Sequence, residues 1–496
     1  MKKALLWIFC LIALMMTACS SGNEVRTTGQ NVYLRAVAKE ISGDYVSAFS
    51  LYQQALPLLR QEGHEGLIRD CRLGWKRTFL IVQDFAATEQ DIRDTLAQTF
   101  TITEEQINNL ISRIAYLDMG GSRYYFSDFM DTVIHLDLTL MQQLPAVMAR
   151  NRLGYQAVAS FVNIPGPTSG SPYINPISYE AVATYAVPRN LLPADGLLKI
   201  WQPVPIVIDS QTEVEITQVL PADYVVNPAT IGGNLGDIYL EVPLGGLSGD
   251  LNITIRFKFK HYEQRFTMID PNNVGDYDKS SDLYREFTAS RKDIRITPEI
   301  SDKARQIVGS EQNPYRAARL IYDYIVEQVT YSHMPYGTVE SLGIPASVYV
   351  HEHGFGDCGA QSMYFAALCS ALGIPARAAG GYQLFPGMEG GHFWAEFYLP
   401  NYGWVPVDTS VAQIANYLPE LTPAQKQAFK GYLFGSLDPY RWVVQKDVDM
   451  PFSPPVTEPT MMMLALQMPA ALCDEINGFP EEVIWPYYQI QFTPQP

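Results

Sequence analysis

The feature that most constrains this chain of 496 residues is a glycine-containing loop that leads into an apolar helix. The loop at residues 354–358 has the sequence GFGDC, and its aspartate suits a helix N-cap. Gly373 and Pro375 supply a stop signal, so we predict a helix over about residues 358–372. Cys358 then lies in the first turn, where unpaired backbone N–H groups favour an anion and are expected to lower the thiol pKa. Cys369, late on the apolar stripe, is expected to be inert core.

Two predicted strands follow this helix. Residues 392–399 alternate between apolar and polar side chains, with His392 on the polar face, and residues 403–408 form the next strand, which ends in Asp408. A hairpin centred on Pro400 places His392 directly opposite Asp408, with Cβ atoms about 5 Å apart. Pro406 donates no ladder hydrogen bond, so we expect an edge strand or a bulge at that position.

Cys358, His392 and Asp408 form a candidate catalytic triad. In this interpretation Cys358 attacks a carbonyl carbon, His392 takes and returns the proton, and Asp408 fixes the imidazole tautomer and stabilises the imidazolium. The backbone N–H of Cys358 supplies one donor of an oxyanion hole. The second donor stays open, because Tyr331 and Tyr336 are candidates that equally suit plain aromatic packing.

The order of these motifs resembles the transglutaminase-like superfamily, over about residues 297–410. The resemblance implies a papain-like α+β core, chemistry on amide or thioester groups of glutamine or peptides, and no metal ion in most bacterial members. It also implies a family of cross-linkers, peptidases and amidases in which some members have lost activity. The matching elements are Gly356-Asp357-Cys358, Leu372 to Arg377, His392 with Trp394 and Glu396, Gly403 to Val405, and Asp408.

The rest of the chain indicates a multidomain α+β protein. Residues 19–150 are predicted to form a helical region, in which one segment resembles a degenerate tetratricopeptide repeat; plain helical packing is favoured, because a stable stack needs about three repeats. Residues 151–290 change to period-two alternation between Gly and Pro turns, which predicts an immunoglobulin-like β-sandwich. The transglutaminase-like domain is predicted to cover residues 291–420, and a β-rich C-terminal extension residues 421–496.

The first residues are predicted to be an export signal and not part of the fold. Lys2 and Lys3 precede a short apolar stretch, and small residues then run up to Cys19, an arrangement that resembles a bacterial lipobox. We expect residues 1–18 to be removed as a lipoprotein signal peptide and Cys19 to be lipidated. The protein would then be anchored to the bacterial cell envelope, at the outer membrane where the host has one. An ordinary secretory signal with an incidental cysteine is the alternative.

The net charge and the cysteine content restrict the range of possible functions. The net charge of −17 opposes nucleic-acid binding, which needs basic patches. The scattered cysteines predict free thiols and no disulfide scaffold. We therefore predict an extracytoplasmic thiol enzyme, without cofactor or metal, that hydrolyses amide bonds of peptides or proteins or transfers the acyl group to an amine. The alternative is a non-catalytic, lipid-anchored binding or assembly module on the same fold, which the large accessory regions support; the complete triad favours the enzyme.

Overall fold

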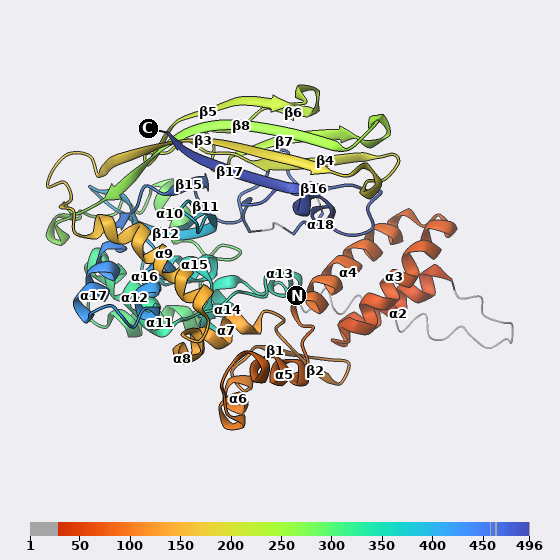
Figure 1. Cartoon of the computed structure of the whole chain (residues 1–496), viewed down its shortest axis with the longest axis horizontal. Coiled ribbons are helices and arrows are strands. Elements are labelled where there is room, and N and C mark those ends of the chain that lie inside the picture. The colour runs from red at the N-terminus through yellow and green to blue at the C-terminus, as the bar shows by residue number, and fades with distance from the viewer. Residues whose placement is uncertain (1–27, 457, 462–463, 496) are drawn as a thin grey trace.

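A computed structural model describes residues 28–456, 458–461 and 464–495. The predicted signal peptide at residues 1–18 and the predicted lipidation site Cys19 lie outside the described residues. Within the described ranges, no helix has the length and the apolar character that crossing a membrane requires. Figure 1 shows a helical N-terminal region, two packed sheets and a core of helices and strands, which confirms the predicted multidomain α+β class.

The N-terminal region consists mainly of helices, as predicted. Its elements are α2 (Gly29–Ile41), α3 (Tyr45–Glu62), α4 (Glu65–Asp84), α5 (Glu89–Thr99), α6 (Glu104–Ile111), β1 (Tyr116–Met119), β2 (Ser122–Tyr125), α7 (Phe129–Leu136), α8 (Leu138–Met141) and α9 (Pro145–Val162). Thr103 and Gln106 form a capping box that begins α6. Tyr52 of α3 packs against Gly74 of α4, where an added Cβ would lie 2.4 Å from a ring carbon. The β1–β2 hairpin is an addition that the helical prediction did not contain.

Two antiparallel sheets pack together in the upper part of Figure 1 and form the predicted sandwich. Their strands are β3 (Tyr173–Val187), β4 (Leu197–Pro203), β5 (Gln211–Leu220), β6 (Val225–Asn227), β7 (Asp237–Pro243), β8 (Leu251–Arg265), β14 (Ser436–Leu437), β16 (Ala470–Leu472) and β17 (Tyr488–Gln495). One sheet has the order β14-β8-β3-β17, with β5 paired to β8, and the other has the order β16-β4-β7-β6. Alternate residues of β8, such as Ile253, Ile255 and Phe257, are buried in the apolar layer with Ile200 and Leu240 from the second sheet.

The predicted C-terminal extension does not form a separate domain, because its strands join the sheets of the sandwich and of the core. Strands β16 and β17 each complete one sheet of the sandwich, and β15 (Arg441–Gln445) pairs with the core sheet. The short helix α18 (Pro480–Ile484) contacts β16. The predicted boundaries at residues 290 and 420 therefore do not separate the sheets, because these strand pairs join segments far apart in the sequence and leave no local pattern.

The core packs one buried helix, α15 (Cys358–Ala371), against an antiparallel sheet of order β13-β12-β11-β15. The strands are β11 (Ala376–Gln383), β12 (Gly390–Leu399) and β13 (Gly403–Val407). The helix was predicted with one apolar stripe, but nearly all its residues are buried because helices and the sheet surround it. The other core elements are α10 (Asp282–Thr288), α11 (Pro298–Val308), α12 (Pro314–Gln328), β9 (Thr330–Tyr331), α13 (Tyr336–Leu342), α14 (Ala346–His353), β10 (Phe355–Gly356), α16 (Thr409–Tyr417) and α17 (Pro423–Tyr432).

Strand β15 fastens the core sheet to the sandwich. Its Trp442 is fully buried and stacks on Phe257 of β8 with ring centroids 5.5 Å apart. The buried Gln211 amide donates to the carbonyls of Ile206 and Val443 at 2.8 Å each. Aromatic stacking and satisfied buried amides both favour a single packing arrangement, so β15 holds a fixed position beside the core sheet.

Candidate functional site

Cys358 occupies the first position of α15, as predicted. Asp357 is the N-cap, and its Oδ1 accepts hydrogen bonds from the Ala360 backbone N–H at 3.0 Å and from the Tyr336 hydroxyl at 2.7 Å. The thiol of Cys358 is half-buried, whereas Cys369 on the same helix is fully buried. The two cysteines of α15 thus have the contrasting environments that the sequence predicts, and the four described cysteines, Cys71 and Cys473 included, are all free.

The expected lowering of the Cys358 pKa is wrong for the resting site. Burial raises the pKa of this thiol, and the neighbouring Asp357 carboxylate raises it further. The backbone N–H groups of Phe393 and Gly359 lower the pKa in opposition but do not outweigh burial. The thiol is therefore protonated at neutral pH, and a thiolate at Cys358 requires a base that removes the proton.

The predicted hairpin exists, but its register differs from the expected one by two residues. Val407 lies opposite Ala395, and Val405 lies opposite Phe397, so β13 ends before it reaches the position opposite His392. Asp408 is the N-cap of α16, where its Oδ1 accepts from the Val411 N–H at 3.0 Å. An even shift keeps every side chain on its predicted face. The β13 strand, which contains a proline, lies at the sheet edge, as expected.

His392 and Asp408 are in direct contact in spite of this shift. The imidazole Nε2 lies 2.8 Å from Asp408 Oδ2, and both side chains are buried, with 5% and 0% of their surface exposed. The short chain between the end of β13 and α16 turns the carboxylate back toward the imidazole. The other ring nitrogen, Nδ1, makes no hydrogen bond within the described part of the chain.

A fully buried arginine, which the sequence did not indicate, completes the environment of Asp408. Arg441 of β15 donates from Nη1 to Asp408 Oδ2 at 2.8 Å and from Nη2 to Asp438 Oδ2 at 2.6 Å. All three side chains have no exposed surface. Burial raises the pKa of Asp408, but the charges of His392 and Arg441 outweigh this effect and lower the pKa far below its usual range. Asp408 is therefore ionised at any physiological pH.

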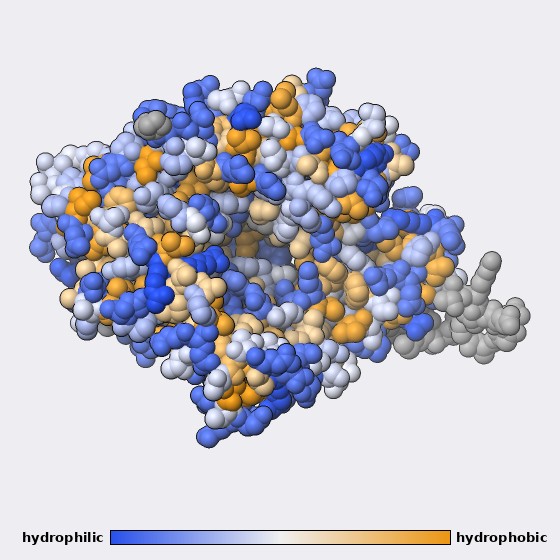
Figure 2. Space-filling model, viewed as in Figure 1, coloured by the Kyte–Doolittle hydropathy of each residue, from blue (hydrophilic) through white to orange (hydrophobic). Residues whose placement is uncertain are grey.

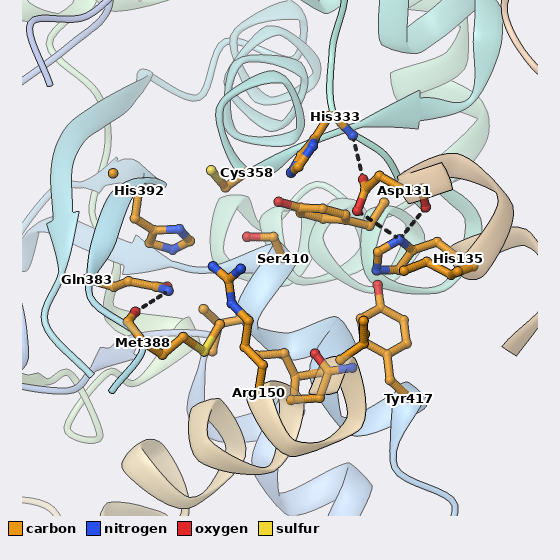
Figure 3. A pocket seen from close by; sticks show the side chains of 17 residues that line it. Asp131, His135, Arg150, His333, Cys358, Gln383, Met388, His392, Ser410 and Tyr417 are labelled. Atoms are coloured by element: carbon orange, nitrogen blue, oxygen red, sulfur yellow. Dashed lines mark hydrogen bonds and ion pairs between the residues drawn. The ribbon is translucent and has the colours of Figure 1, made fainter. Parts of the chain in front are cut away.

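Cys358 and His392 line one cavity of about 230 Å³. Figure 3 shows both side chains at its upper left, with Gln383, Met388 and Ser410 beside them. The remaining lining residues are Asp131, Ile134, His135, Val147, Arg150, Asn151, Tyr331, His333, Gly391, Val411, Ile414 and Tyr417. Figure 2 shows that the molecule is hollowed near the middle of the face drawn there. Tyr331 thus borders the cavity, whereas Tyr336, the other suggested oxyanion donor, gives its hydroxyl hydrogen to Asp357.

Helices α7 and α9 of the N-terminal region form the opposite wall of this cavity. Asp131 of α7 accepts from the His333 backbone N–H at 2.7 Å, and the His135 ring lies 3.6 Å from its other carboxylate oxygen. The exposed His333 imidazole is hydrogen-bonded to Asp128, and this bond raises the pKa of His333 to about 9. Nothing in the sequence near residues 128–151 marks these residues, because the contact joins segments about two hundred positions apart.

Comparisons with known proteins agree with this core. Residues 301–409 match the model of the transglutaminase-like superfamily. An uncharacterized protein of Haemophilus influenzae is 29% identical over 184 residues, which cover 32% of this chain and 48% of that protein, so the chain spans about half the length of the relative it matches.

Two solved structures are more distant. One is a candidate cysteine protease from Cytophaga hutchinsonii, with 14% identity, a TM-score of 0.39, and coverage of 65% of this chain and 92% of that chain. The other is the periplasmic domain of TgpA from Pseudomonas aeruginosa, with 14% identity, a TM-score of 0.26, and coverage of 55% and 95%. Neither likeness assigns an activity to this chain at such low similarity. The family match and the fold together identify residues 301–409 as a transglutaminase-like core domain.

Proposed function

We propose that this chain is a thiol acyl-transfer enzyme that acts on peptide or glutamine-type amide bonds outside the cytoplasm. Cys358 is the nucleophile, His392 the general base and acid, and Asp408 the residue that orients His392. The observation that carries the proposal is the buried His392 Nε2–Asp408 Oδ2 contact of 2.8 Å at the cavity that the Cys358 thiol also lines. A nucleophile, a base and an ionised group that orients the base are the parts that covalent acyl transfer requires.

The ion pair determines which imidazole nitrogen acts. Because Asp408 is ionised, it accepts a hydrogen bond from Nε2–H and leaves the lone pair on Nδ1. Nδ1 then takes the proton of the Cys358 thiol as sulfur attacks the amide carbonyl carbon. The resulting imidazolium is stabilised by Asp408, and its Nδ1–H protonates the leaving amine as the C–N bond breaks. Water or a second amine attacks the thioester, returns a proton through His392 and releases the thiol.

The raised thiol pKa of Cys358 favours this sequence of steps. A preformed thiolate would need no base, but a protonated and half-buried thiol reacts only where proton removal accompanies attack. The thiolate that forms briefly lies at the N-terminus of α15, and the backbone N–H groups of Gly359 and Phe393 favour its negative charge. We therefore expect strong dependence of thiol reactivity on His392.

Alkylation tests the activated thiol directly. We would treat the purified protein with iodoacetamide at neutral pH and map the adducts by mass spectrometry over time. Cys358 should react faster than the buried Cys71, Cys369 and Cys473, and His392→Ala should remove most of this advantage while circular dichroism shows an intact fold. Labelling of Cys358 at the rate of the buried cysteines, or equal labelling in the histidine variant, would falsify the activated-thiol claim.

The reaction itself is tested with peptide libraries that contain glutamine, with and without an added primary amine. Cleavage, deamidation or amine incorporation that disappears in Cys358→Ala identifies the acyl acceptor. Cys369→Ala, on the same helix, serves as the matched control and should retain the product. Product formation by Cys358→Ala would contradict the proposed nucleophile, whereas a chain that binds peptides with an unreactive Cys358 would support the non-catalytic binding module.

The location proposal has a separate test. We propose that the protein is exported and held at the cell envelope by a lipid on Cys19, on the evidence of the charged, apolar and small residues that precede it. Cys19→Ala should release the protein from membranes or block its processing. Unchanged membrane association of this variant would contradict the lipid anchor and leave the enzymatic proposal intact.

A further inference from the structure

We propose that Arg150 forms an anion subsite of the cavity, so that the preferred substrate is a peptide amide with a carboxylate close to the bond that is attacked. The inference rests on the proposed function, since it specifies the substrate class of the same site. It assigns a role to α9, a helix outside the transglutaminase-like core domain. The chemical partner is a carboxylate, from either an acidic side chain or a free peptide C-terminus.

The position of Arg150 is the first observation. The residue lines the same cavity as Cys358 and His392. In Figure 3 its side chain rises from α9 and its guanidinium points between His392 and Ser410, toward the reacting groups. From this position the guanidinium reaches the part of a substrate that lies next to the attacked carbonyl.

The lack of a partner is the second observation. Arg150 makes neither a hydrogen bond nor an ion pair within residues 28–456, 458–461 and 464–495. Arg152, two positions further along α9, is paired with Glu420 at 2.6 Å. In a chain with a net charge of −17, carboxylates are abundant, yet none of the described ones neutralises Arg150. Its charge is therefore available to a ligand.

The charges on the other cavity walls do not offset the positive charge of Arg150. Asp131 is the one carboxylate among the described residues that line the cavity, and it already accepts the His333 N–H. Figure 3 shows Asp131 beside His333 and His135, away from the Arg150 guanidinium. The Asp408 carboxylate is fully buried and shared by His392 and Arg441. Arg150 thus directs an uncompensated positive charge from α9, on the opposite wall, toward the thiol and the imidazole.

The guanidinium group of arginine has the geometry and the charge that suit a carboxylate ligand. Its planar N–H donors match the two carboxylate oxygens, and charge-assisted pairs of this kind are stronger than neutral hydrogen bonds. The Arg150 side chain is exposed, so solvent screens part of its charge, and a single charge in this setting can change a rate by up to about 10-fold. Arg150 therefore favours substrates whose carboxylate reaches α9 while the amide meets Cys358.

Two alkylating reagents of nearly equal size test the subsite without a known substrate. Iodoacetate carries a carboxylate and iodoacetamide carries an amide in its place, so the ratio of their rates at Cys358 reports the electrostatic preference of the cavity. We expect Arg150→Gln to lower this ratio about 10-fold and Arg150→Glu to lower it further. Arg152→Gln, on the same helix, should keep the wild-type ratio. Added salt should lower the wild-type ratio and leave the ratio of Arg150→Gln nearly constant.

The outcomes distinguish failure of the anion subsite from failure of the proposed thiol enzyme. If Cys358 reacts with iodoacetamide in a His392-dependent way but the ratio is equal in wild type and Arg150→Gln, the anion subsite is wrong and the thiol enzyme stands. If Cys358 is inert to both reagents, both proposals fall. Matched peptides then distinguish the source of the carboxylate. Preference for an acidic side chain over its amide, or for a free over an amidated C-terminus, must disappear in Arg150→Gln; a preference that persists would also overturn the subsite.

Discussion

Replacing Arg441 with methionine removes the positive charge that two buried carboxylates share. Methionine has a similar length and no charge, so the change creates little empty space. In the wild type, Arg441 Nη1 lies 2.8 Å from Asp408 Oδ2, and Nη2 lies 2.6 Å from Asp438 Oδ2, with no exposed surface on any of the three side chains. The variant leaves the Asp438 carboxylate without its ion-pair partner and Asp408 with His392 alone.

The size of the effect follows from burial. Breaking a buried ion pair by removal of one partner costs about 3–5 kcal/mol, because an uncompensated charge stays in a medium of low dielectric. An exposed pair contributes about 0–1 kcal/mol. The Arg152–Glu420 pair, with 47% and 43% of its side-chain surfaces exposed, provides the matched comparison in this chain. We therefore expect Arg441→Met to lower the free energy of unfolding by several times as much as Arg152→Met.

The pH dependence of the stability loss provides a second test of the electrostatic explanation. The pKa of folded Asp408 is lowered, so its ionisation contributes stability above the ordinary aspartate pKa, and this contribution disappears as the pH falls. Without Arg441 the pKa of Asp408 rises toward or above that ordinary value. The stability difference between wild type and Arg441→Met should be largest at neutral pH and should shrink below about pH 4.

Urea unfolding followed by tryptophan fluorescence at pH 7 and at about pH 2.5, below the ordinary aspartate pKa, measures both effects. Asp438→Asn in the Arg441→Met background removes one of the two orphaned carboxylates and should recover part of the lost stability. If Arg441→Met costs no more than Arg152→Met at pH 7, the electrostatic account of this cluster is refuted. The same conclusion follows if the loss is equal at both pH values.

Two further predictions concern backbone space and a buried acid. A Cβ added at Gly381 would lie 1.8 Å from the Trp442 carbonyl oxygen, so Gly381→Ala should push β15 away from β11. Thermal melts should show a loss of about 1–3 kcal/mol or more in the free energy of unfolding. Gly390→Ala is the control and should have little effect, because no atom lies within 4 Å of the added Cβ. Burial and the Asp293 carboxylate raise the pKa of Asp449 from 3.8 to about 8, so folding takes up a proton between these values. Asp449→Asn should therefore melt higher than wild type at pH 8 and equally at pH 4, and equal melting temperatures at pH 8 would contradict this.

Local chemistry explains why part of the site was predictable. An aspartate N-cap, a glycine and proline stop, and alternating strands are signals that act within a few residues, and they located α15, β12 and β13. Alternation also fixed the face of each side chain, but it cannot distinguish registers that differ by two residues. The observed pairing centres the turn on Asn401, which adopts a positive φ of 73°, and not on Pro400. The predicted contact between His392 and Asp408 appears nonetheless, because the carboxylate reaches the imidazole from beyond the strand end.

The missing parts of the site come from distant segments. Arg441 follows Asp408 by 33 positions, and it reaches the carboxylate only because β15 pairs with β11 on the far side of the sheet. Arg150 lies in a helix that looks like any surface helix when taken alone. Its significance depends on the packing of α9 against α16 and α17. The position of Arg150 at the cavity depends on contacts with a region about two hundred residues away in the sequence. Periodicity within the helical region carries no information about such contacts and therefore cannot predict this position.

The division of the site among segments limits what the core domain can do alone. Residues 301–409 hold the thiol, the imidazole and the carboxylate. Arg441, which together with His392 lowers the pKa of that carboxylate, lies on β15, and the stack of Trp442 on a sandwich strand fixes β15. The wall opposite the thiol comes from α7 and α9. An isolated core would therefore bury Asp408 without Arg441 and open the cavity to solvent, so the thiol, the imidazole and the groups around them form one unit only in the whole chain.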